Sequence, residues 1–169
     1  MYSEYISKLN HVLSRVADSD LKLLKDRIKN CKGNIYILGN GGSSAIASHA
    51  CNDLMKICNK AAFCLTDNTP TFSAFSNDDG YDKSFLKQLK ILLKKDDLVI
   101  YLSTSGNSMN ILQGYNFSKN ICKNICIHGL SSKNNFVDEI CLESTNTQIL
   151  EDCFQVLFHW CSLEMQQMI

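Results

Sequence analysis

Five short apolar runs, separated by segments of helical pattern, constrain the fold of this chain more than any other feature. The runs are rich in Ile, Val and Leu and lack the polar alternation of a strand with one exposed face. Strands that are buried on both faces and joined by helices pair in parallel. We therefore predict an α/β fold, a three-layer α/β/α sandwich around a five-stranded parallel sheet, with strands at residues 34–38, 61–65, 97–102, 124–128 and 139–143.

Helical spacing of apolar residues accounts for much of the remaining chain. A pattern with three-and-four spacing predicts a helix over residues 2–16, an N-terminal extension of the sandwich, and a second helix at about 19–31. With 169 residues, 45% of them hydrophobic, and no linker or repeat, residues 1–169 are predicted to form a single domain. The other helices are expected at about 43–59, 80–94, 108–120 and 147–168.

Charge and cysteine content exclude several classes of partner. Seventeen basic residues balance seventeen acidic ones without forming a basic stripe, so we expect no nucleic-acid partner. The N-terminus lacks the pattern of a signal peptide and no apolar run is long enough to cross a bilayer, so we expect no membrane partner. Nine cysteines without a Cys-x-x-Cys pair are typical of reduced core residues, which indicates a cytoplasmic protein.

The loop after Leu38 has the composition of an anion-binding loop. Open parallel sheets bind ligands at the carboxyl ends of their strands, and here "GNGGSS" leads into a helix. A P-loop would require a lysine, which is absent. A dinucleotide-binding fingerprint would require glycine at position 44, where this chain has Ser44. Asp67 nevertheless follows the second strand, where a ribose-binding acid could lie, so dinucleotide binding stays open as an alternative.

The loop after Leu102 carries four hydroxyl groups within "STSGNSMNIL". Taken alone, such a cluster is typical of turns and helix caps. Two hydroxyl-rich turns that both open helices at strand ends instead predict a pocket that holds a phosphate by neutral donors and helix dipoles, without lysine.

Together, "LGNGGSS…H" and "LSTSGNSMNIL" resemble the sugar isomerase (SIS) domain family and, within it, the phosphoheptose isomerases. "LTDNTPTFSAFSNDDGYDKSF" is also similar to that family's segment after its second strand, so the likeness spans most of the chain. The resemblance implies a flavodoxin-like SIS fold. It also implies an aldose–ketose isomerase that converts sedoheptulose 7-phosphate to D-glycero-D-manno-heptose 7-phosphate, for heptose synthesis in bacterial surface polysaccharide.

The same resemblance implies which residues contact the substrate, a phosphosugar. The first loop would line the sugar phosphate, the second would grip the phosphate itself, and an Asn-Asp pair would contact substrate. In this sequence these residues are Asn40, Gly41, Gly42 and Ser43 in the first loop, Ser103, Thr104, Ser105 and Ser108 in the second, and the pair Asn77 and Asp78.

Two pairs of polar residues could carry out chemistry. His49 and Asp53 are four residues apart on one helical face, where they could ligate a metal or share a proton, although a lone helical histidine is often a core residue. Glu151, Gln155 and His159 also step by four along the otherwise apolar final helix. This stripe either faces a site or forms hydrogen bonds across a subunit interface.

The resemblance maps these pairs onto the family's catalytic residues, with Asp53 in place of a Glu and Glu151 in place of a Gln. Because aldose–ketose isomerisation needs a base and an acid, we assign a carboxylate as the base, Asp53 first and Glu151 second, and His159 as the acid. His49, Asp53, Glu151 and His159 are also N and O ligands that suit a zinc ion. Glu151 and His159 lie about 12 Å apart along the helix axis, so one ion reaches both only if their side chains lean together or two chains contribute. The two replacements leave open stronger metal binding, another sugar, or lost activity.

Family resemblance further implies a homotetramer with active sites between subunits, and the apolar terminal helices are consistent with that burial. Two other functions remain open. One is a non-catalytic SIS protein that binds a protein partner, as replication-initiator-binding relatives do. The other is an isomerase or sensor for a different sugar phosphate.

Overall fold

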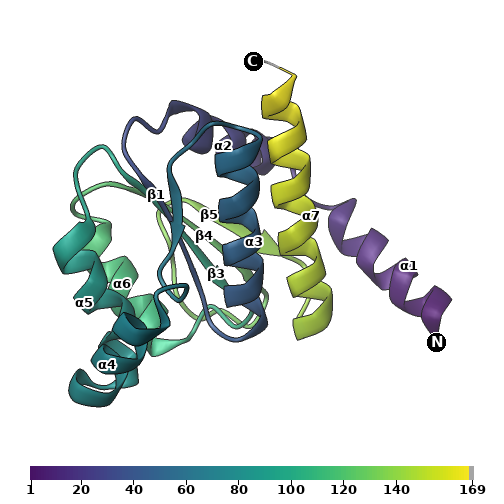
Figure 1. Ribbon diagram of the computed structural model, residues 1–169. Coiled ribbons are helices and arrows are strands. Elements are labelled where there is room, and N and C mark those ends of the chain that lie inside the picture. Colours follow the sequence, from purple (N-terminus) through teal and green to yellow (C-terminus); the bar gives the residue numbers. More distant parts are fainter. Residues whose placement is uncertain (168–169) are drawn as a thin grey trace.

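The computed structural model, which describes residues 1–167, confirms the predicted α/β fold around a five-stranded parallel sheet (Figure 1). The strand order is β2-β1-β3-β4-β5, which is the flavodoxin-like order. The strands are β1 (Ile35–Gly39), β2 (Ala62–Cys64), β3 (Leu98–Ser103), β4 (Lys123–Gly129) and β5 (Glu139–Leu142).

Helices cover both faces of the sheet, as expected for three layers. Each face has its own apolar cluster, one under α2, α3 and α7 and the other under α5 and α6. Figure 1 shows α3 and α7 side by side, with α1 packed at the edge of this layer. The helices are α1 (Tyr2–Leu13), α2 (Asp18–Asn30), α3 (Gly42–Lys56), α4 (Thr69–Asp79), α5 (Ser84–Leu92), α6 (Met109–Ser118) and α7 (Thr147–Gln166).

Helices α3 and α7 pack against each other, and their buried residues include small side chains. Ala47 and Ala50 of α3 are fully buried, and they belong to the same cluster as Cys153 and Leu157 of α7. This packing brings the polar residues that flank the contact on each helix toward the same surface. The α3/α7 contact therefore determines which groups from the two helices can act together.

The observed element boundaries differ in places from those predicted. The prediction that every strand is buried on both faces is wrong for the outer strands, because β2 and β5 are sheet edges; Phe63 is 46% exposed. The helix predicted from residue 80 begins with a short 3-10 helix, Tyr81–Lys83. The N-terminal helix ends at Leu13, and the predicted end of the final helix, residue 168, lies outside the described residues.

Helix α4 was not predicted, because its sequence shows no apolar periodicity. In the structure none of its residues is buried. Its sequence signals are local. The Asn68 side chain accepts a hydrogen bond from the Thr71 N–H, and Pro70 lies in the first turn, where its missing N–H costs nothing.

The cysteines are free thiols, and six of the nine are buried: Cys51, Cys58, Cys64, Cys126, Cys153 and Cys161. Burial raises the pKa of Cys153 to about 11 and that of Cys161 to about 12, so these thiols stay protonated at neutral pH. Cys141 is exposed, unlike the core residues expected from the sequence. Among residues 1–167, no helix has the length and apolar character needed to span a bilayer.

Candidate active site

The strand order reverses between β1 and β3, which opens a crevice at the carboxyl ends of these two strands. Gly39 and Leu102 are in register there, so the loops that follow them lie side by side. The Asn40 and Asn110 side-chain amides form two reciprocal hydrogen bonds of 2.8 and 2.9 Å between the loops. Tyr81 donates a third hydrogen bond, of 2.8 Å, to the Asn40 amide oxygen. The crevice is therefore braced by side chains from three segments.

Glycines give the first loop its shape. Gly41 has φ +54°, a conformation that favours glycine, and a Cβ on Gly39 would lie 2.6 Å from the Ser43 carbonyl oxygen. Helix α3 starts at Gly42 with no side-chain cap, and α6 likewise starts beside the crevice without one. Two helix amino termini whose N-cap residues make no capping hydrogen bond thus meet in one place, which favours an anion.

The second loop, residues 103–108, is here called the hydroxyl turn. The Ser103 and Ser105 hydroxyls accept hydrogen bonds from the Gly106 and Asn107 N–H groups, at 3.1 and 3.2 Å. Each hydroxyl keeps its own proton to donate to a ligand. Ser108 is partly exposed and makes no cap hydrogen bond to the helix it precedes, and Thr104 is partly exposed as well. The turn offers four neutral donors to an anion in the crevice.

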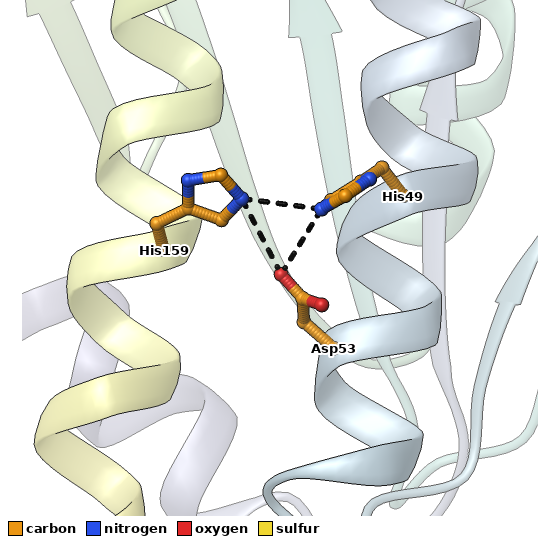
Figure 2. A group of neighbouring side chains, drawn as sticks. All are labelled: His49, Asp53 and His159. Atoms are coloured by element: carbon orange, nitrogen blue, oxygen red, sulfur yellow. Dashed lines mark hydrogen bonds and ion pairs between the residues drawn. The ribbon is translucent and has the colours of Figure 1, made fainter.

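His49, Asp53 and His159 form a cluster where α3 faces α7 (Figure 2). The Asp53 Oδ2 atom lies 3.4 Å from Nε2 of His49 and 3.6 Å from Nε2 of His159. The two Nε2 atoms are 3.1 Å apart. The Asp53 side chain is only 12% exposed, whereas both histidines are about half exposed. The cluster combines a buried carboxylate with two accessible imidazoles.

The donor atoms of this cluster fit a metal ion. Tetrahedral zinc with ligand bonds of 2.0–2.2 Å requires its ligand atoms to be about 3.3–3.6 Å apart. Of the three observed separations, 3.4 and 3.6 Å lie in that range and 3.1 Å lies slightly below it. Two imidazole nitrogens and a carboxylate oxygen are also ligand types that zinc prefers.

Glu151 lies away from the cluster, at the amino terminus of α3. Its Oε1 atom accepts a hydrogen bond of 3.3 Å from Ser43, and a Cβ on Gly42 would lie 2.5 Å from the same oxygen. The residue that contacts His159 from α7 is instead Gln155, whose Nε2 atom lies 2.8 Å from the imidazole Nε2. Of the four residues in the expected ligand set, the structure brings three together.

Asn77 and Asp78 lie at the carboxyl end of α4, where both are exposed. The Asn77 amide donates a hydrogen bond of 2.8 Å to Asp78, and within residues 1–167 no hydrogen bond joins either of them to the crevice. Sequence reasoning missed Asn110 and Tyr81, which brace the crevice. The sequence feature that could have identified Asn110 is a polar residue in the first turn of an otherwise apolar helix. In the structure Asn110 is only 1% exposed.

Comparison with known proteins gives consistent matches. A model of the SIS domain family matches residues 4–122. The phosphoheptose isomerase of Helicobacter pylori (strain P12) is 34% identical over 71% of this chain, which spans 65% of that protein. The probable phosphoheptose isomerase of Thermoplasma acidophilum is 34% identical over 80% of this chain and 81% of its own length.

A solved structure supports the fold. Phosphoheptose isomerase GmhA from Neisseria gonorrhoeae superposes with a TM-score of 0.89, covering 98% of this chain and 95% of that chain. At 23% identity, this likeness establishes the fold alone.

Replacing Asn40 and Asn110 tests whether their amide pair stabilises the crevice. Replacing either residue with Ala leaves the other amide without its partner, so each variant should lose about 1–3 kcal/mol of unfolding free energy. The double variant should lose less than the sum, by about 0.5–3 kcal/mol, in urea denaturation. Asn116→Ala, at an exposed position of α6, is the control and should change stability by no more than about 0.5 kcal/mol. Additive losses would show that the two amides do not interact.

Proposed function

This chain belongs to the SIS domain family, and from that membership we propose that it is a phosphosugar aldose–ketose isomerase whose substrate is sedoheptulose 7-phosphate. The relatives named phosphoheptose isomerase support the substrate. The observation that carries the proposal is the alignment of two features along α3: an anion crevice at its amino terminus and an acid–base cluster further along. The product would be D-glycero-D-manno-heptose 7-phosphate, a precursor for surface polysaccharide.

The spacing of these two features supports a long sugar. His49 follows Gly42 by seven residues, which is about 10 Å along a helix. A phosphate in the crevice and a carbonyl at the cluster therefore require a chain of several carbons between them. Glu151 stands near the crevice end, where its carboxylate can accept hydrogen bonds from sugar hydroxyls. The phosphate ligands in this proposal are Asn40, Gly41, Gly42, Ser43, Ser103, Thr104, Ser105 and Ser108, and Asn77 and Asp78 would contact substrate from α4.

The chemistry needs two proton transfers. A base removes the proton from the carbon beside the carbonyl and returns it to the neighbouring carbon, while an acid moves the hydroxyl proton between the two oxygens. We assign the base to Asp53, whose carboxylate lies beside both histidines, and the acid to His159, whose side chain is half exposed. These assignments apply to the metal-free site, because a metal would engage both Asp53 and His159. Glu151 is the second candidate for the base, and it could act only on a substrate carbon near the crevice end of α3.

Zinc is the proposed metal, and His49, Asp53 and His159 would hold it. When bound, it would supply a Lewis acid that stabilises negative charge on the substrate oxygen. The chain as a whole would form a single phosphosugar-binding domain, and the free thiols support a cytoplasmic location.

A homotetramer is also part of the proposal. An apolar groove of about 900 Å³ runs along the edge strand β2, with Met55, Phe63, Ile91 and Leu92 exposed in it. Apolar surface of this kind is typical of an interface between proteins.

Replacing His159 tests the enzyme proposal. His159→Ala should reduce turnover of sedoheptulose 7-phosphate by about 10²–10⁴, the usual contribution of an acid–base group, while the hydroxyl turn still binds phosphate. Product formation measured by NMR and phosphate affinity measured by calorimetry separate these effects. His11→Ala, at an exposed histidine of α1, is the matched control and should leave both unchanged. Wild-type protein inert on heptose, hexose and pentose phosphates would contradict the proposal and favour the partner-binding alternative.

Elemental analysis tests the metal. Wild-type protein should bind one zinc per chain, and His49→Ala and His159→Ala should each lose it, because ligands act as a set. Glu151→Ala is the informative control. In the wild-type protein the Glu151 carboxylate contacts Ser43 and not the cluster, so the Glu151→Ala variant should retain zinc. Zinc lost from Glu151→Ala as readily as from His49→Ala would restore the four-residue ligand set.

Light scattering tests the assembly. The mass should be four times that of one chain, and Phe63→Lys should yield smaller species, because a charge in the β2 groove opposes its burial. Lys87→Ala, on α5, is a control outside the groove lining. A wild-type monomer at micromolar concentration would contradict the tetramer.

A further inference from the structure

His128, a residue that the proposed reaction does not use, lies beside the hydroxyl turn. It is in register with Ser103 across β3 and β4, and adjacent strands are about 4.8 Å apart. Tyr101 and Cys126, two residues earlier on each strand, belong to the apolar cluster under α5 and α6. Because side chains alternate along a strand, Ser103 and His128 point to that same face. The imidazole therefore lies next to the side chain that begins the turn.

Both ring nitrogens of His128 face hydrogen-bond acceptors. Nδ1 lies 2.9 Å from the Gly129 carbonyl oxygen, and Nε2 lies 3.4 Å from Oε2 of Glu139. The His128 side chain is only 4% exposed, so water does not separate these atoms. A neutral imidazole has one N–H and would leave its second nitrogen lone pair against an oxygen. With an ionised Glu139, a ring that carries two protons would donate to both oxygens.

The pair of His128 and Glu139 also fixes both ends of the loop between β4 and β5, residues 130–138. At the start, His128 binds the Gly129 carbonyl, while the Gly129 N–H donates to Thr104 in the hydroxyl turn at 3.2 Å. At the end, Glu139 Oε2 accepts the Phe136 N–H at 3.1 Å, and the Phe136 ring packs on the imidazole. The pair therefore holds the 130–138 loop in place beside the turn.

The 130–138 loop also forms hydrogen bonds with the hydroxyl turn. Asn134 donates hydrogen bonds to Asn107 Oδ1 and to the Gly106 carbonyl, at 2.9 and 3.0 Å. Asn107 donates to the Ser131 carbonyl at 2.8 Å and accepts the Lys133 N–H at 3.1 Å. The shape of the turn thus depends on the loop that His128 and Glu139 hold.

We propose that His128 is a buried imidazolium, held by Glu139, that supplies positive charge to the phosphate site and positions the hydroxyl turn through the 130–138 loop. The turn itself contains no lysine or arginine, although a phosphate ester carries up to two negative charges. His128 is the positioning residue that compensates for this lack. The inference rests on the proposed phosphate site but requires no catalysis.

Few other ionisable groups face the imidazole. On β5, Cys141 is its in-register neighbour beside Glu139. On α6, Tyr115 lies behind Phe136 and accepts the Val137 N–H through its hydroxyl, with the Lys119 ammonium over its ring. On β3, the neighbour is the uncharged Ser103. Glu139 is therefore the carboxylate that contacts the imidazole directly.

The protonation state can be measured without any ligand. Nitrogen-15 NMR of the wild-type protein at neutral pH, with the His128 signals assigned by their loss in His128→Gln, should show two protonated ring nitrogens. A ring with one protonated nitrogen would overturn the inference.

Binding tests the role of the charge. Calorimetry with inorganic phosphate and with sedoheptulose 7-phosphate should show affinity reduced roughly tenfold in His128→Gln, as expected when a nearby opposite charge is removed. Glu139→Gln keeps the side-chain shape, and its amide can donate to a neutral imidazole, so it should weaken binding similarly even if His128→Gln fails to fold. His11→Gln, at an exposed histidine, is the matched control and should bind normally.

The outcomes separate this inference from the proposed function. Normal binding by folded His128→Gln, or by Glu139→Gln, would overturn the inference and leave the isomerase proposal intact. Wild-type protein that binds neither phosphate nor the sugar phosphate would overturn both. Normal binding by the wild-type protein without turnover would contradict only the proposed isomerase activity.

Discussion

The reversal of strand order between β1 and β3 is the constraint on which the rest of the site depends. At that point the helices that follow the two strands leave in opposite directions, so their amino termini open onto one crevice. Neither α3 nor α6 has a side-chain cap. In the proposed site, backbone N–H groups and serine hydroxyls bind the phosphate as neutral donors, and His128 supplies the positive charge that no lysine in either loop provides.

The second constraint is the packing of α3 against α7. The two helices lie side by side, and His49, Asp53 and His159 meet as a result, although 110 positions separate the two histidines. The crevice lies at the amino terminus of α3, and the cluster lies about two to three turns further along the same helix. A single element thus sets the distance between the group that would hold a phosphate and the groups that would move protons.

The sequence predicted the sheet, the two loops and the pairing of His49 with Asp53, because these depend on local periodicity and spacing. It did not predict α4, which has no apolar face and is marked only by the Asn68 cap and Pro70. It also could not decide where Glu151 lies. A step of eight residues separates Glu151 and His159 by about 12 Å along the helix. The sequence could not show whether the Glu151 side chain leans toward His159 or, as observed, contacts Ser43. His128 escaped notice because its partners come from the next strand and loop.

The proposed site transfers a proton between neighbouring carbons of a phosphosugar. The most direct measurement is proton NMR of sedoheptulose 7-phosphate incubated with the protein in deuterium oxide. Because a carboxylate base exchanges its proton with solvent, we expect an aldose product with deuterium at carbon 2. Recovery of unchanged, undeuterated sedoheptulose 7-phosphate would contradict it.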